Sequence, residues 1–247
     1  MRTLTLVSLL SILLAISPLT TAQLSSGAET RDQYRVTMLR AAPGKWVAMR
    51  ALIENQGEAG TADESGRMAS FRMRHSQGAH WDFMLIQPIE GLEHYFSDEI
   101  QAREVGFRDS IAKLADFEED WFVQGPAHKT FKAAYPAAGA FLIEMYRARA
   151  GMKQALLQSR AKENRFLAKI DKPTNFIFTG IIGADWDVMT IGFYRNFAHW
   201  GSAGKNHSSE ALEQAAREVG YRSVNQLAPG LRELIIQHQD TLASALD

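Results

Sequence analysis

The chain has 247 residues, no cysteine and a formal charge of −1, with 27 Lys and Arg against 28 Asp and Glu. The lack of cysteine excludes disulfides, thiolate metal sites and a cysteine nucleophile. The balanced charge, without runs of Lys or Arg, argues against nucleic acid and anionic membrane surfaces as partners.

The first 22 residues have the layout of a secretory signal peptide. Arg2 supplies a positive charge, residues 4–16 are mainly apolar, and small residues precede a cut before Gln23. The apolar stretch is shorter than the roughly 20 residues of a membrane span. We therefore expect residues 1–22 to be removed on export, a periplasmic or secreted protein with no membrane association after cleavage, and a flexible leader over residues 23–30.

Residues 31–126 are expected to form a first repeat that begins with a strand, a helix and a hairpin of two strands. Apolar alternation predicts strands, and apolar residues three or four apart predict a helix. These elements are expected at residues 34–40, 45–56, 68–75 and 80–88. Two helices are expected next, over residues 99–105 and 109–122, and residues 121–123 are only a weak candidate for a fourth strand.

Residues 127–138 are expected to connect this repeat to a second one over residues 139–247. The second repeat is expected to have the same order of strand, helix, two strands and two helices. Its elements are expected at residues 141–147, 152–169, 175–182, 185–193, 209–219 and 224–246. The last helix is interrupted near Pro229, and no clear fourth strand follows it.

Three short sequence blocks occur twice, in the same order. In one, Gly-Ala-His-Trp-Asp-Phe-Met becomes Gly-Ala-Asp-Trp-Asp-Val-Met; in another, Ala-Arg-Glu-Val-Gly-Phe-Arg changes only its Phe to Tyr. The matched pairs are residues 38–41 and 145–148, 78–84 and 183–189, and 102–108 and 216–222. Matched blocks in one order indicate a tandem repeat.

A duplicated strand-helix-strand-strand-helix unit resembles the ferredoxin-like fold of the dimeric α/β-barrel superfamily, and most of all its NIPSNAP-like tandem proteins. Antibiotic-biosynthesis monooxygenases, EthD-like proteins and chlorite dismutases are further members. The resemblance implies an α+β fold in which two tandem ferredoxin-like βαββα repeats pack their sheets face to face as a pseudo-twofold α/β barrel. It also implies a small-molecule ligand inside the barrel or between sheet and helices, and it is compatible with a homo-oligomer.

Two arginine and two histidine side chains are candidates for catalysis. We expect the first and third strands of each repeat to run parallel, which puts Arg40 beside His94 at one sheet edge and Arg147 beside His199 at the equivalent edge. The arginine would hold a carboxylate or enolate, and a histidine near neutral pKa would transfer a proton. The structural alternative is that each arginine pairs with a helix end or an acid, and each histidine caps a loop.

Three aromatic side chains, Tyr95, Tyr146 and Trp200, are expected to line the ligand site near these groups. Asp82 and Asp187 each begin a third strand, at the edge expected to be opposite the arginines. An Asp in such a position accepts backbone N–H bonds and fixes a turn. These two carboxylates are therefore predicted to be structural.

The remaining candidates indicate packing rather than chemistry. Trp81 and Trp186 are expected to be core residues, as large aromatic side chains usually are. His75 and His80 flank a predicted turn, but only Asp82 is an obvious third ligand near them. Because a zinc site needs three or four ligands, no metal site is predicted.

The sequence leaves three functions open. The first is a small-molecule protein that uses the barrel cavity, as a binder or as a cofactor-free oxygenase or isomerase. The second is a haem protein of the same superfamily with His94 or His199 as axial ligand, and the third is a non-enzymatic interaction protein. The motifs of serine hydrolases, P-loop proteins and Rossmann dehydrogenases are missing, which disfavours those classes.

Overall fold

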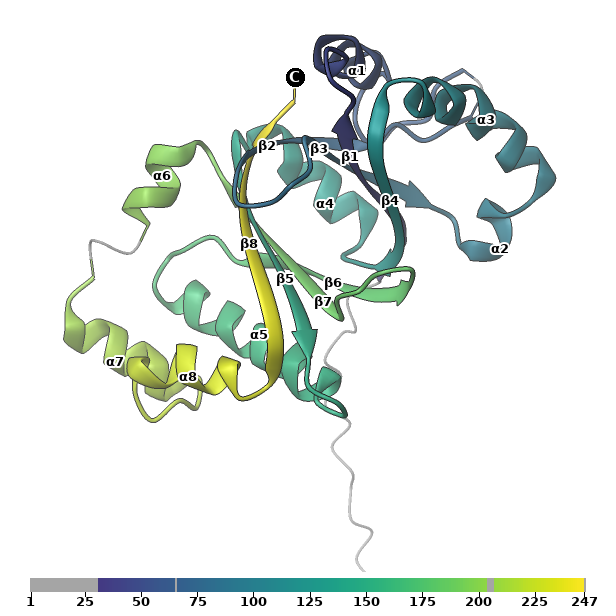
Figure 1. Ribbon diagram of the computed structural model, residues 1–247. Coiled ribbons are helices and arrows are strands. Elements are labelled where there is room, and N and C mark those ends of the chain that lie inside the picture. The colour runs from purple at the N-terminus through teal and green to yellow at the C-terminus, as the bar shows by residue number, and fades with distance from the viewer. Residues whose placement is uncertain (1–30, 65, 204–206, 247) are drawn as a thin grey trace, which may run out of the picture.

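The computed structural model describes residues 31–64, 66–203 and 207–246. The predicted signal peptide, residues 1–22, and the predicted leader, residues 23–30, lie outside the described residues. The described strands form one closed antiparallel barrel in the order β1-β3-β2-β8-β5-β7-β6-β4, with helices packed around it (Figure 1).

The first half of the described chain alternates strands and helices in the order βαββααβ. Its elements are β1 (Gln33–Ala41), α1 (Trp46–Glu54), β2 (Phe71–Gln77), β3 (Phe83–Ile89), α2 (Leu92–Tyr95), α3 (Asp98–Ala112) and β4 (Ala115–Gln124). The strands lie in the order β4-β1-β3-β2, and each neighbouring pair is antiparallel. This is the ferredoxin-like arrangement with its fourth strand present.

The second half follows the same strand order. Its elements are β5 (Ala140–Ala148), α5 (Lys153–Lys169), β6 (Asn175–Ile182), β7 (Val188–Tyr194), α6 (Phe197–Ser202), α7 (Ser209–Glu218), the 3-10 turn η2 (Val224–Gln226), α8 (Leu227–Arg232) and β8 (Ile235–Ala245). The strands lie in the order β8-β5-β7-β6. Two further antiparallel pairings, β2 with β8 and β4 with β6, join the halves into a barrel.

Each half contains a fourth strand, of which the sequence patterns offered only the weak candidate over residues 121–123. The predictions of helix over residues 109–122 and 224–246 are wrong at their C-terminal ends, because β4 and β8 lie there. On the outer face of β4, Asp120 pairs with Arg35 at 2.6 Å, and on the inner face Glu119 lines a cavity. A strand with charges on both faces has no apolar alternation, so its pattern was mistaken for a helix.

The main apolar cluster fills the barrel lumen with inward-facing side chains from all eight strands. Trp81 and Trp186 belong to it and are 1% and 6% exposed, which confirms that they are core residues. On the area scale of about 25 cal/mol per Å², aromatic side chains of this size contribute several kcal/mol to stability through burial.

The segment between the halves closes one end of this lumen. It forms α4 (His128–Ala134) and the 3-10 turn η1 (Tyr135–Ala137). Phe131 of α4 is fully buried, and its ring lies 5.0 Å from that of Phe176 and 5.1 Å from that of Phe193. The Tyr135 hydroxyl donates to the Arg72 carbonyl oxygen at 2.5 Å. The lumen is therefore filled at the end where β1 and β6 begin.

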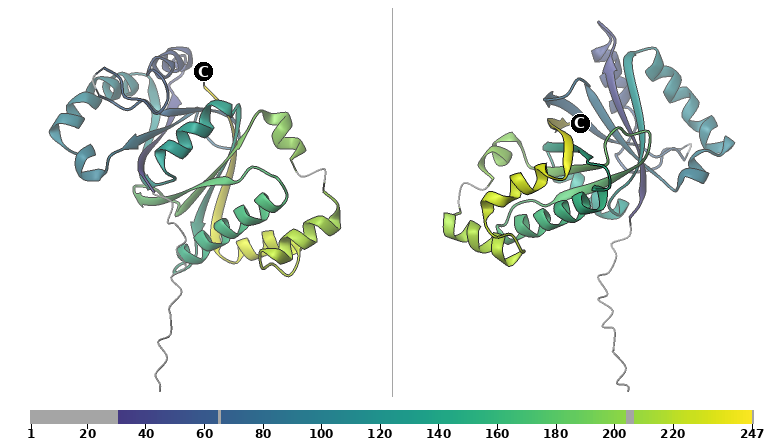
Figure 2. Two further views of the ribbon diagram at one scale, coloured as in Figure 1. Left: turned by 180° about the vertical axis from the view of Figure 1, so that it is seen from behind. Right: turned by 60° about the horizontal axis from the view of Figure 1, so that its bottom comes forward.

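Helices cover the outer faces of the two halves on opposite sides of the barrel (Figure 2). The helices α1 and α3 bury Met49, Ile53 and Ile111 in a cluster with side chains of β1 and β3. In the second half, α5 packs on the barrel and α7 and α8 pack around α5. Among the described residues, no helix is long and apolar enough to cross a membrane.

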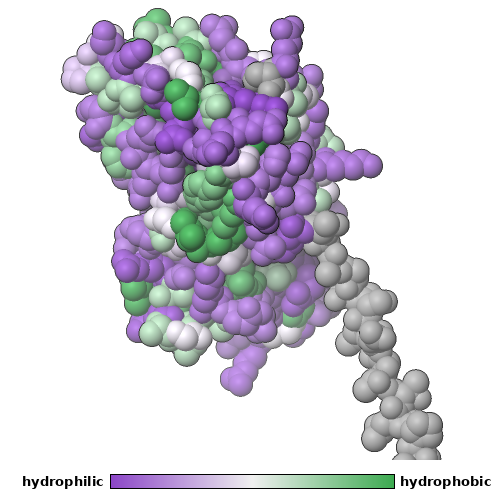
Figure 3. Space-filling model, turned by 90° about the vertical axis from the view of Figure 1, so that its right-hand side faces the viewer, coloured by the Kyte–Doolittle hydropathy of each residue, from purple (hydrophilic) through white to green (hydrophobic). Residues whose placement is uncertain are grey.

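The face seen in Figure 3 is mainly hydrophilic, with one compact hydrophobic area between the two halves. Near the pairing of β4 with β6, Phe96 and Ile182 are 57% and 58% exposed. The Phe96 ring packs 5.3 Å from that of Phe122, and Phe122 is the strand partner of Ile182. These exposed side chains therefore continue an apolar contact that joins the halves.

Candidate functional site

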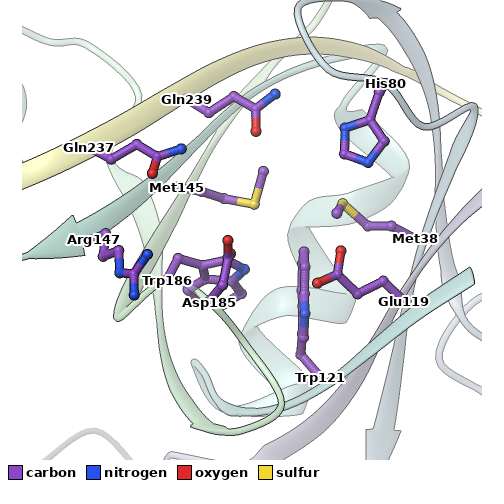
Figure 4. A pocket seen from close by; sticks show the side chains of 10 residues that line it. All are labelled: Met38, His80, Glu119, Trp121, Met145, Arg147, Asp185, Trp186, Gln237 and Gln239. Carbon is purple, nitrogen blue, oxygen red and sulfur yellow. The ribbon is translucent and has the colours of Figure 1, made fainter.

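A cavity of about 280 Å³ lies at the end of the barrel opposite α4 (Figure 4). We call it the mouth cavity. Strands β1, β4, β5 and β8 and the β2–β3 and β6–β7 turns contribute its walls. The lining residues are Met38, His80, Glu119, Trp121, Met145, Arg147, Asp185, Trp186, Gln237 and Gln239. The walls thus combine an apolar interior with a ring of polar and charged side chains.

Equivalent positions of the two halves face each other across the mouth cavity. Met38 pairs in register with Glu119, just as Met145 pairs with Gln239. His80 and Asp185 are a further pair that lines the cavity, whereas of the pairs Arg40 and Arg147, and Phe117 and Gln237, only Arg147 and Gln237 do. Both halves therefore contribute to the cavity, but its two sides differ in charge.

Two tryptophans form the deep wall of the mouth cavity. The rings of Trp121 and Trp186 lie 5.2 Å apart at an angle of 89°. Their indole Nε1 atoms are buried and have no hydrogen-bond partner among the described residues, and the same holds for Trp81. A buried donor without a partner costs about 1–3 kcal/mol. The walls of the mouth cavity therefore contain two buried donors that no described residue satisfies.

The structure places both predicted arginines at this end of the barrel but gives them different surroundings. Arg40 Nε donates to Asp116 Oδ1 at 3.0 Å, and its guanidinium lies 5.8 Å from the centre of the Phe117 ring. Arg147 lines the mouth cavity and has no hydrogen bond or ion pair within the described part of the chain. For Arg40, the structural alternative of pairing with an acid therefore holds.

The prediction that each arginine lies beside a histidine is wrong because β1 and β3, like β5 and β7, are antiparallel. The strand end that carries Arg40 faces the beginning of β3, while His94 follows the far end of β3. The same is true of Arg147 and His199 in the second half. The structure therefore brings the two arginines to one end of the barrel and both histidines to other places.

The carboxylates that begin the third strands lie next to the arginines, at the edge where they were not expected. Asp82 Oδ2 accepts from the Ala41 N–H at 2.8 Å, and Asp187 Oδ2 accepts from the Ala148 N–H at 2.9 Å. Both carboxylates thus bind backbone, as predicted for structural residues, although the N–H groups belong to the neighbouring strand rather than to the turn.

Neither histidine forms a site in the described structure. His94 Nε2 lies 3.5 Å from Glu90 Oε2 in a half-exposed position. His199 Nδ1 accepts from the Arg195 N–H at 3.2 Å, and its ring packs against that of Tyr194 at 5.8 Å. The His199 imidazole therefore caps the loop after β7, which is the structural alternative stated for it.

The three aromatic residues expected around the ligand lie on outer faces of the barrel, away from the mouth cavity. Tyr95 is buried near Arg35, and burial raises the pKa of its phenol. Tyr146 lies under α5, where its hydroxyl accepts from Arg160 at 3.3 Å. Trp200 is 37% exposed on α6 and lines a separate depression.

Sequence analysis missed a buried charge network between α3 and the first half of the barrel. Glu104 is 2% exposed and lies 3.3 Å from Arg67 Nε and 3.8 Å from Arg35. Its carboxylate also accepts from Gln87 Nε2 at 2.8 Å, and Arg35 binds Asp120 at 2.6 Å. The positive and negative side chains pair with one another, so we infer that the network is structural and holds α3 on the sheet. Its only sequence signal was that Glu104 belongs to a repeated block.

No protein-family model matches the sequence, and no curated protein matches it. Among solved structures, an anthrone oxidase-like protein is similar, with 11% identity, a TM-score of 0.55, and coverage of 89% of this chain and 92% of that chain. A putative chlorite dismutase matches with 14% identity, a TM-score of 0.54, and coverage of 88% and 96%. A putative monooxygenase from Lactobacillus acidophilus matches with 10% identity, a TM-score of 0.51, and coverage of 88% and 95%.

These likenesses show that the chain has the fold of the dimeric α+β barrel proteins. The resemblance stated from the sequence is confirmed at this level, while the closer likeness to NIPSNAP-like proteins stays a prediction. The activities in the names of the similar proteins belong to those proteins.

The residues around the two proposed axial histidines do not fit haem. The space beside His94 is a cavity of about 120 Å³, and Glu104 and Arg67 of the charge network line it. Small-molecule and cofactor pockets typically have volumes of about 300–1,000 Å³, so this cavity is too small for haem. His199 already accepts a hydrogen bond and packs on a tyrosine. We therefore derive no haem chemistry from these histidines.

Proposed function

We propose that the protein binds a small, partly apolar molecule in the mouth cavity. This proposal depends on the composition of that cavity. Trp121, Trp186 and two methionines form its apolar walls, polar and charged side chains line the rest, and the two indole N–H groups are buried without a partner among the described residues. Apolar walls with a few polar groups are typical of small-molecule sites. A wholly solid core would instead have favoured an interaction protein.

The polar ring also contains groups that exchange protons. His80 and Glu119 are both on the side of the first half, and Asp185 replaces His80 on the other side. Cofactor-free isomerase or oxygenase chemistry would use such a group to take a proton from the bound molecule. We include this chemistry in the proposal and place it at His80 or Glu119, with export to the periplasm or beyond as its setting.

Binding can be tested through tryptophan fluorescence. Titration of the purified protein with 2-naphthoate and naphthalene-2-carboxamide should quench the emission with saturation, because two of the five tryptophans line the mouth cavity. Trp121→Phe should remove a large part of the change. Trp200→Phe is the matched control and should keep it, because Trp200 lies on α6, outside the mouth cavity.

Two results would contradict the proposal. One is the absence of saturable binding for every probe. The other is quenching that persists in Trp121→Phe and disappears in Trp200→Phe, which would place the ligand on the outer face of the second half. For the catalytic part, His80→Gln and Glu119→Gln should each slow proton exchange of a bound enolisable ketone, and unchanged rates in both variants would refute it.

A further inference from the structure

The two arginines at the mouth differ because one acidic residue has no counterpart in the second half. Both first strands have a bulge at the same place, between Arg40 and Ala41 and between Arg147 and Ala148. In the first half this bulge leaves Asp116 next to Arg40, and the two side chains pair at 3.0 Å.

In the second half the equivalent bulge residue is Ile236, which is 61% exposed. Arg147 therefore has no acid in the place where Arg40 has one. The strand β8 also presents the neutral Gln237 and Gln239 where β4 presents Phe117 and Glu119. Arg147 is thus a positive charge without a hydrogen-bond or ion-pair partner among the described residues, on a wall where β8 is neutral.

Two carboxylates do line the mouth cavity, but neither neutralises Arg147. No ion pair within 4.0 Å joins Arg147 to Glu119 or to Asp185 in the described structure. Glu119 belongs to β4, on the side of the first half, and Asp185 belongs to the β6–β7 turn (Figure 4). The guanidinium keeps its planar set of donors available, and these donors match a carboxylate bidentately.

The buried indoles add donors of the same kind. Trp121 and Trp186 are 1% and 6% exposed, and their Nε1 atoms have no acceptor among the described residues. An indole N–H only donates, and so does a guanidinium. Arg147 is exposed at the cavity and thus calls for acceptor oxygens on the ligand, while the two indole N–H groups are donors buried in the same walls.

We infer that the ligand of the mouth cavity is a small carboxylate with a flat apolar body. This inference rests on the proposed function and adds the chemical class of the ligand. The carboxylate pairs with Arg147 on the β8 side, and the apolar body packs against Met38, Met145 and Trp186. Arg40 does not bind the ligand, because its guanidinium is already paired with Asp116.

The test compares three probes with one body and different charges: 2-naphthoate, naphthalene-2-carboxamide and 2-naphthylmethylammonium. The wild-type protein should bind the carboxylate about tenfold more tightly than the amide, as expected for a hydrogen-bonded charge pair. Arg147→Gln should make the two equal. Ile236→Asp should do the same by giving Arg147 the acid that Arg40 has, and Ile236→Asn is the matched neutral control that should keep the preference.

The outcomes separate this inference from the proposed function. Equal binding of carboxylate and amide by the wild-type protein, or preference for the ammonium probe, overturns the carboxylate while the cavity remains a binding site. Binding of none of the probes overturns both. Because Ile236 is exposed, its variants should fold, and circular dichroism should confirm that they do. A preference for the carboxylate probe that survives both Arg147→Gln and Ile236→Asp also overturns the inference.

Discussion

Replacing Glu104 with alanine should destabilise the protein strongly, because this carboxylate is the centre of a buried charge network. It is 2% exposed, accepts from Gln87 Nε2 at 2.8 Å and lies 3.3 Å from Arg67 Nε. Removing one partner of a buried ion pair leaves an uncompensated charge and costs about 3–5 kcal/mol. At about 2–4 °C per kcal/mol for a chain of this size, the Tm should fall by roughly 6–20 °C.

The repeated sequence block supplies the matched control. Glu218 occupies the position of Glu104 in the second copy of the block, but it is solvent-exposed and pairs with Lys169 at 2.9 Å. An exposed pair contributes little, so Glu218→Ala should leave the Tm nearly unchanged. Urea and thermal unfolding followed by circular dichroism measure both variants.

Equal Tm shifts in Glu104→Ala and Glu218→Ala would contradict this prediction, because the burial of the carboxylate would then not determine the loss of stability. Glu104→Gln refines the test. It keeps the size and one acceptor oxygen but removes the negative charge beside Arg67, while Arg35 keeps Asp120, so its Tm should lie between that of the wild type and that of Glu104→Ala. A Gln variant as stable as the wild type would show that the hydrogen bonds, not the charge, hold α3 in place.

Three further predictions address the mouth, the strand edges and the pH dependence. Glu119→Gln should tighten 2-naphthoate binding about twofold to threefold in fluorescence titrations, since two like charges about 8 Å apart in water repel by about 0.5 kcal/mol; weaker binding would contradict this. Asp82→Ala removes the acceptor of the Ala41 N–H and should lower the free energy of unfolding by about 1–3 kcal/mol in urea. The Tyr34 hydroxyl donates to the Pro126 carbonyl oxygen at 2.8 Å, and burial followed by the charge of Asp32 raises its pKa. The contribution of the neutral Tyr34 phenol to stability is fully present below the unfolded pKa of about 10 and is lost as the pH rises beyond it. The free energy of unfolding should therefore fall from pH 10 upward, and it should fall less in Tyr34→Phe. Urea titrations at several pH values measure both.

The sequence patterns predicted most of the elements but not the strands that complete each half. The hairpins of β2 with β3 and of β6 with β7 follow apolar alternation, so they were found nearly in place. β8 was missed, and β4 was reduced to the weak candidate over residues 121–123, because their inward faces reach the polar mouth and their outward faces carry polar and charged side chains. A strand whose partners supply its pairing needs no apolar alternation of its own, and β4 and β8 each pair with the first strand of their own half and with a strand of the other half.

The candidate site was predicted in part, and the error came from strand direction. Both arginines were chosen because they end matched strands, and they do lie at one end of the barrel. The first and third strands of each half were predicted to be parallel, which placed His94 and His199 at the wrong end of the barrel. The side chains that share the mouth cavity with Arg147, His80 and Asp185, stand in the repeated block directly before its tryptophans, where they were predicted only to begin the third strands.

Comparing the two halves helps to separate structural from functional positions. Asp82 and Asp187 are identical in the two halves and accept equivalent backbone N–H groups, so they serve the fold. Several positions at the mouth differ between the halves: the pairs are Asp116 and Ile236, Glu119 and Gln239, and His80 and Asp185. A binding site on a pseudo-twofold axis must lose its symmetry to hold an asymmetric molecule in one orientation. The differences between the halves at the mouth would supply this asymmetry, and Arg147, which has no ion-pair partner among the described residues, would hold the carboxylate end of the ligand.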